Sequence, residues 1–166
     1  MTSDTVPTDP SVLNTTVLSN FAAIDRIGLV AHLAGICTVP VVKHELNAGV
    51  QTHPYLQPAL DALHDTILVA PFSETVANRD DVVRSHLDPG ESQAFALADT
   101  HHGRLLTDDG DARTFAKQQD VTVVGSVGLL LTALNAGRIT EATANDWLQT
   151  WIDDYDYYVP YRTIDE

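Results

Sequence analysis

The chain has 166 residues, of which 44% are hydrophobic, and this is enough to bury the core of one domain. Its one cysteine, Cys37, excludes an internal disulfide and argues against a cysteine-based zinc site. The longest apolar stretches are too short to cross a bilayer, and the polar start carries no secretory signal. We therefore expect a cytoplasmic protein without a membrane partner, with a flexible lead-in at 1–10 before a single domain at 11–166.

Acidic residues dominate the charge. The 23 Asp and Glu residues outnumber the 9 Lys and Arg residues, which gives a formal net charge of −14. This balance is typical either of a protein that avoids nucleic acid, because phosphate binding relies on Lys and Arg, or of a halophilic surface that stays hydrated in a salt-rich cytoplasm. We favour the halophilic interpretation, and strong salt then screens repulsion within roughly a few ångströms. A nucleic-acid substrate therefore remains open.

Strands and helices are expected to alternate along the chain. The hydrophobic pattern predicts, in order, a strand at 11–14, helices at 17–24 and 27–33, a strand at 36–39, helices at 40–48 and 56–63, a strand at 66–70, a short helix or irregular turn at 80–87, a helix at 91–101, a strand at 104–107, a helix at 111–119, a strand at 121–124, and helices at 129–136 and 143–155. This alternation is typical of an α/β fold with a parallel sheet covered on both faces.

Polar residues follow two of the predicted strands. Asn14 ends the first strand, and Asp108 and Asp109 come directly after the strand at 104–107. Ligands of parallel sheets gather outside the carboxyl ends of the strands. We therefore expect the functional site at this edge.

Two glutamates lie beside apolar helix faces. Glu45 has Val41 and Val42 one turn before it, and Glu91 has Ala94 and Phe95 one turn after it. A carboxylate held against a core is costly unless something pairs with it. Because basic residues are few, a divalent cation such as Mg²⁺ or Mn²⁺, which prefers oxygen ligands, would suit Glu45, Glu91 and Asp109.

Each of these residues also has a purely structural interpretation. Glu91 is well placed to favour the positive end of a helix dipole, and Asp109 or Asp111 is a candidate helix N-cap. Glu45 can reach solvent by tilting, and Asn14 can satisfy the backbone of a turn. The metal hypothesis rests on several of them meeting at one edge.

Five segments of the sequence resemble one known family. They are VLNTTVLSN (12–20), VPVVKHEL (39–46), GESQAFALA (90–98), LLTDDGDAR (105–113), and VGSVGLLL followed by AGRI (124–131 and 136–139). Their order and content resemble the PIN-domain family, in its VapC-like branch. The similarity covers nearly the whole chain beyond residue 10.

The resemblance implies a three-layer α/β/α sandwich with a mainly parallel central sheet. It also implies an acidic pocket that binds Mg²⁺ or Mn²⁺ and hydrolyses RNA phosphodiester bonds. Many members are toxins of toxin–antitoxin pairs, usually homodimeric and silenced by a small antitoxin protein. Carried over to this chain, the family's metal-binding positions fall on Glu45, Glu91 and Asp109.

Further positions take supporting roles by the same resemblance. Asp108 is a candidate metal ligand or support, Asp111 is a candidate support, and the hydroxyls of Thr16 and Ser126 are candidates to hold ligand or phosphate. Asn14 occupies the first acidic position, which is usually Asp in active members. Asn keeps a carbonyl ligand but loses a negative charge, so the alternative is a catalytically weak PIN-like domain that binds RNA or protein as a regulatory module.

The aromatic residues near the C-terminus have two interpretations. Trp147, Trp151 and Tyr155 share one helical face, which is more often used for packing, in a core or across a dimer. Together with Tyr157, Tyr158 and Tyr161, they are also candidates to stack on nucleobases.

Overall fold

The computed structural model describes residues 6–157, 159 and 163–164. In this part of the chain, five short strands form a parallel sheet in the order β3-β2-β1-β4-β5. The elements are β1 Ser11–Leu13, α1 Thr15–Ala23, α2 Gly28–Ala31, β2 Ile36–Thr38, α3 Pro40–Gly49, the 3₁₀ turn η1 Pro54–Leu56, α4 Gln57–Asp65, β3 Leu68–Val69, α5 Glu74–Val83, α6 Pro89–Thr100, β4 Arg104–Leu106, α7 Gly110–Gln118, β5 Thr122–Val124, α8 Ser126–Asn135 and α9 Glu141–Asp154.

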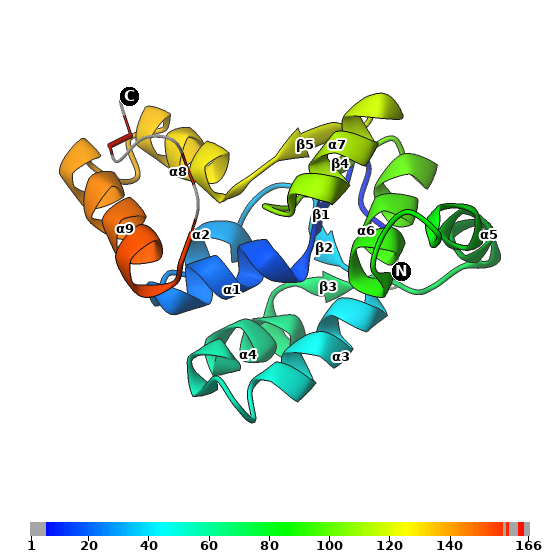
Figure 1. Ribbon diagram of the computed structural model, residues 1–166, viewed down its shortest axis with the longest axis horizontal. Coiled ribbons are helices and arrows are strands. Elements are labelled where there is room, and N and C mark those ends of the chain that lie inside the picture. Colours follow the sequence, from blue (N-terminus) through cyan, green and yellow to red (C-terminus); the bar gives the residue numbers. More distant parts are fainter. Residues whose placement is uncertain (1–5, 158, 160–162, 165–166) are drawn as a thin grey trace.

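Helices cover both faces of the sheet, as the alternation of elements predicts. In Figure 1, α1, α2, α8 and α9 lie on one side of the strands, while α5 and α6 lie on the other. Helix α6 packs against β1 and β4, and α5 packs on α6. The prediction of an α/β/α sandwich with a parallel central sheet is confirmed.

The central strand β1 marks the point where the strand order reverses. It pairs with β2 on one side and with β4 on the other, both in parallel. The chain runs outward from β1 to β3 and then returns to the opposite side through α5 and α6. A reversal of this kind leaves a crevice at the carboxyl ends of the two strands that flank it, here β1 and β4.

Several helices begin at residues whose side chains or rings suit a helix start. The Asn14 side chain accepts a hydrogen bond from the Thr15 backbone, and Ser73 and Thr140 cap α5 and α9 in the same manner. Pro40 and Pro89 stand in the first turns of α3 and α6, where no backbone N–H is needed.

Most predicted bounds differ from the observed ones by one or two residues, and two helices differ by three or more. The structure has α5 at Glu74–Val83 where the sequence predicts a short helix or turn at 80–87, because the Ser73 hydroxyl caps a helix that starts earlier. Helix α8 begins at Ser126 rather than at 129. The turn η1 at Pro54–Leu56 was not predicted.

The C-terminal helix packs against the first helix. Trp151 of α9 is fully buried, its ring meets the Phe21 ring edge-on at 5.3 Å, and its indole N–H donates to the Asn20 carbonyl at 2.7 Å. Packing is therefore the role of Trp151. Tyr155 at the end of α9 is 37% exposed, whereas Tyr158 and Tyr161 lie outside the described residues.

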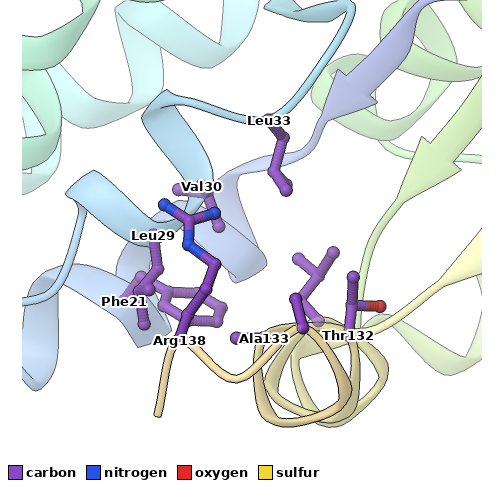
Figure 2. Close-up of a pocket in the computed structure, with 9 residues that line it drawn as sticks. Phe21, Leu29, Val30, Leu33, Thr132, Ala133 and Arg138 are labelled. Atoms are coloured by element: carbon purple, nitrogen blue, oxygen red, sulfur yellow. The ribbon is translucent and has the colours of Figure 1, made fainter.

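A small apolar cavity of about 50 Å³ lies between α1, α2 and α8. Figure 2 shows Phe21, Leu29 and Val30 facing Ala133 of α8, with the Arg138 side chain extending beside them. The hydrophobic core is thus less than fully packed at this point. Among the described residues, no helix combines the length and the apolar character that crossing a bilayer requires.

Candidate functional site

Four of the predicted site residues line one cavity at the carboxyl edge of the sheet. Asn14 follows β1, Thr16 lies in the first turn of α1, Glu45 lies in α3 and Glu91 lies in the first turn of α6. With Thr15 and Asp88 they enclose about 300 Å³, and we call this space the carboxylate cavity. The structure thus brings these four segments together at one edge of the sheet.

Glu45 is aimed at the start of α6. On its own helix, Val42 and Leu46 are buried and orient α3 against the core. The Thr15 hydroxyl donates to Glu45 Oε1 at 2.5 Å, and a Cβ on Gly90 would lie 2.5 Å from the same oxygen. The absence of a side chain at Gly90 therefore lets the carboxylate approach the first turn of α6.

Glu91 and Asp109 form a pair of carboxyl groups. Burial, followed by the charges of Asp109 and Asp88 and a hydrogen bond with the Asp109 side chain, raises the pKa of Glu91 from 4.5 to about 7. Glu91 also accepts a hydrogen bond from the Asp88 backbone, the return bond of a capping box. Glu91 therefore has both roles: it stabilises the start of α6 and it lines the carboxylate cavity.

A chain of hydrogen bonds joins the ends of β1 and β4. The Thr107 hydroxyl oxygen accepts from the Asn14 amide at 3.0 Å and from the Asp109 backbone at 3.1 Å, while Thr16 Oγ1 accepts from the Asp108 backbone at 3.0 Å. Thr107 Oγ1 and Thr16 Oγ1 lie 3.4 Å apart, and either hydroxyl can be the donor of this contact. The Thr16 side chain also lines the carboxylate cavity.

Asp108 faces away from this cavity into a separate network. Its Oδ1 accepts from the Ser126 backbone at 2.8 Å and from the Tyr157 hydroxyl at 2.9 Å. Its Oδ2 accepts from the Asn20 amide at 2.9 Å and from the Ser126 hydroxyl. Asp108 thus supplies the cap that α8 lacks locally, and both of its oxygens are engaged by protein donors.

Asp109 has a structural role as well as a place beside Glu91. Its Oδ2 accepts from the Ala112 backbone at 2.8 Å, so it is the N-cap of α7. Asp111 is exposed in the first turn of the same helix and does not line the carboxylate cavity. The structure brings Asn14, Thr16, Glu45, Glu91 and Asp109 to one region, and it places Asp108 with Ser126 in another and Asp111 outside both.

Four contributing residues are absent from the predicted site, and they are Thr15, Asn20, Gly90 and Thr107. Tyr157 is expected from the sequence only as a candidate to stack on bases, and in the structure its hydroxyl also donates to Asp108. Thr107 could have been found, because a threonine at the carboxyl end of a buried strand faces the same edge as Asn14. Thr15, Asn20, Gly90 and Tyr157 act through contacts between distant elements, for which the local sequence holds no signal.

The donor chemistry of the carboxylate cavity suits a hard divalent cation. The ion pairs found in the described part of the chain are Arg79–Asp99 and Arg84–Asp80, so the acids of the cavity have no Lys or Arg partner there. Oxygen ligands and uncompensated charge both favour Mg²⁺ or Mn²⁺. Within the same described residues, no three Asp, Glu, His or Cys side chains converge into one metal cluster.

Comparison with known proteins identifies the family of the chain. A family model described as a PIN domain matches residues 10–166. A search of curated proteins finds no match. The match extends over the sheet, the carboxylate cavity and α9. The chain therefore belongs to the PIN-domain family, whose members are generally nucleases.

Proposed function

We propose that this PIN domain is a divalent-metal-dependent endoribonuclease that hydrolyses RNA phosphodiester bonds at the carboxylate cavity. The observation that carries the proposal is the meeting of Glu45 and Glu91 in one cavity, with Asp109 hydrogen-bonded to Glu91 and no basic partner among the described residues. Acids held together in this way repel one another, and a bound cation relieves that repulsion.

Different residues of the site would bind the metal ion, bind the phosphate and fix the end of β4. Glu45, Glu91 and Asp109 would have to close together to hold Mg²⁺ or Mn²⁺, because the described residues contain no ready-made cluster of three such ligands. The neutral Asn14 would contribute its carbonyl oxygen. A bound divalent ion supplies an activated water and neutralises charge on the phosphoryl oxygens. The Thr16 hydroxyl, which lines the cavity, would donate to the scissile phosphate. Asp108 and Ser126 support this arrangement by fixing the end of β4 against α8.

The biological setting follows from the resemblance to the VapC-like branch and from the charge. We infer a toxin of a toxin–antitoxin pair, a homodimer silenced by a small antitoxin protein in the cytoplasm. The net charge of −14 supports a halophilic protein. In strong salt, RNA is then recognised through short contacts rather than through long-range attraction.

Cleavage of a mixed RNA pool in high salt, with Mn²⁺ and with EDTA, tests the proposal. Asp109→Asn is the sharpest variant, because Asn remains a good N-cap for α7 while the ligand loses its charge. We expect it to lose more than the roughly 10–100-fold that removal of an outer-shell partner costs. Asp81→Asn, on the exposed side of α5, removes the same charge and should cleave as the wild type does.

Other outcomes would contradict the nuclease proposal. Wild-type cleavage by Asp109→Asn, or cleavage that persists in EDTA, would show that these carboxylates do not hold a catalytic metal. If the protein neither cleaves RNA nor binds Mn²⁺, the neutral Asn14 position favours the catalytically weak regulatory module instead.

A further inference from the structure

A second, larger hollow opens beside the carboxylate cavity. It encloses about 580 Å³ and shares Thr15 and Thr16 with that cavity. Tyr55, Tyr155 and Tyr157 form the aromatic part of its lining, so we call it the tyrosine hollow. A strand of RNA whose phosphodiester bond enters the carboxylate cavity would therefore have its neighbouring nucleotide at this hollow.

Two of the tyrosines come from segments that are far apart in the chain. Tyr55 lies in η1 and Tyr155 follows α9, and their ring centroids are 5.2 Å apart with planes inclined by 66°. Tyr55 is half-buried, whereas Tyr155 is 37% exposed. Burial, followed by the neighbouring phenol of Tyr155, raises the pKa of Tyr55 above its ordinary value, so its phenol stays neutral.

The charges around the hollow favour an uncharged base over a phosphate. Its lining contains no Lys, Arg or His among the described residues. The carboxylates present are Asp108, whose oxygens take four protein donors, and the exposed Asp156. A phosphate would meet only like charge here, whereas an uncharged planar ring meets tyrosine rings, with the Ser19 hydroxyl at the same surface.

We propose that the tyrosine hollow binds an unpaired nucleobase of the RNA strand, stacked on Tyr155 and bordered by Tyr55. The proposal rests on the proposed ribonuclease function. Stacking on an aromatic side chain tolerates any base, because every base has a flat π face. It is also insensitive to the screening that weakens phosphate contacts in strong salt. An acidic protein with few Lys and Arg residues can thus bind RNA through its bases.

Binding of a single-stranded ribooligonucleotide that carries 2-aminopurine tests this inference. The fluorescence of this base falls when it stacks, and Ca²⁺ in place of Mn²⁺ supplies a cation for oxygen ligands. We expect quenching by the wild-type protein and about tenfold weaker binding by Tyr155→Ala, within the range for loss of one stacked base. Tyr155→Phe keeps the ring and should bind as the wild type does.

A matched control separates stacking from general loss of exposed aromatic surface. Phe72 is 39% exposed and does not line the hollow, so Phe72→Ala should leave binding and quenching unchanged. Because Tyr155 is at the exposed end of α9, its variants should keep the wild-type circular dichroism. Equal affinity and equal quenching for Tyr155→Ala and the wild type, or no binding by either, would overturn the inference.

The same proteins distinguish this inference from the proposed function. If Mn²⁺-dependent cleavage proceeds and Tyr155→Ala binds as tightly as the wild type, the nucleobase site is wrong and the nuclease remains. If quenching depends on Tyr155 while Mn²⁺ supports no cleavage, the nucleobase site stands and the nuclease proposal fails.

Discussion

The side-chain amide of Asn14 donates a hydrogen bond to the hydroxyl of Thr107, a residue 93 positions later in the chain. Asn14 is 2% exposed and Thr107 is fully buried. Thr107 Oγ1 also accepts from the Asp109 backbone, so with asparagine at position 14 the Thr107 hydroxyl accepts two hydrogen bonds. An ionised carboxylate at position 14 could only accept, so the Thr107 hydroxyl would have to reorient and donate to it.

Asn14→Asp should therefore destabilise the metal-free protein and strengthen metal binding. The loss of one buried donor and the gain of a buried charge should lower the free energy of unfolding in EDTA by about 1–3 kcal/mol. Mn²⁺ should restore more stability to the variant than to the wild type, because the variant offers one more carboxylate. Urea unfolding with and without Mn²⁺ measures both effects. Asn78→Asp, at an exposed position of α5, controls for charge; equal responses in the two variants would refute this account.

Gly90→Ala should reduce cleavage without reducing stability. The new Cβ would lie 2.5 Å from Glu45 Oε1, so the Glu45 carboxylate has to leave its place. Alanine favours helix over glycine, and the free energy of unfolding should stay the same or rise slightly. We expect at least about tenfold slower cleavage, in line with a misplaced ligand. Gly28→Ala, which meets nothing within 4 Å in α2, should leave the rate of cleavage unchanged, with the free energy of unfolding again the same or slightly higher.

Glu91 should make the metal-free protein less stable as pH rises. Its pKa is about 7 in the folded state and 4.5 ordinarily, so the folded chain keeps a proton that the unfolded chain loses. The stabilisation from Glu91 is complete below pH 4.5 and is lost as pH rises through 7. Urea unfolding in EDTA across this range should show the decline, and Glu91→Gln should lack it. Parallel pH profiles for the two proteins would contradict this assignment.

Cys37 should be inert in the native protein. The thiol is fully buried in β2, and burial raises its pKa to about 12, so almost no thiolate exists at pH 8. A chromogenic disulfide reagent should therefore react with one thiol per chain in urea and with none under native conditions. Rapid native labelling would show that β2 opens readily.

The small cavity under α8 should accept extra methyl groups. Ala133 lines this cavity of about 50 Å³, and Ala133→Val should raise the free energy of unfolding by roughly 0.5–1 kcal/mol. Ala116→Val makes the same change at a fully buried helical position that lines none of the described cavities, and overpacking should cost about 1–3 kcal/mol. Both variants lose the same helix propensity. The difference between their free energies of unfolding in urea therefore reports the effect of filling the cavity. Two destabilised variants would mean that the cavity cannot be filled.

The sheet and its functional edge could be predicted because they depend on local pattern. Short β-branched or apolar runs end at polar residues, and parallel strands carry those residues to one edge. Asn14 and Asp109 were placed by this rule. Helix α5 was misplaced because its apolar face is weak: Asp80 is buried there, bonded to Arg84 and Ser92, where the pattern suggests a surface charge.

The details of the site could not be predicted because they depend on packing between distant segments. Asp108 and Asp109 are neighbours in the sequence, yet one caps α8 and the other caps α7 and meets Glu91. Which of them faces the cavity depends on donors from α1, α8 and the residues after α9. The position of Glu45 depends likewise on the missing side chain of Gly90.

The bonds from Trp151 to Asn20 and from Tyr157 to Asp108 set the order in which this edge can be completed during translation. The first helix is synthesised early, but Trp151, which packs against it, follows 131 residues after Asn20. A nascent chain that has emerged only as far as α8 lacks both bonds and has one side of α1 uncovered. Because domains fold as units once their parts are available, the acidic edge is completed only after α9 and Tyr157 have left the ribosome.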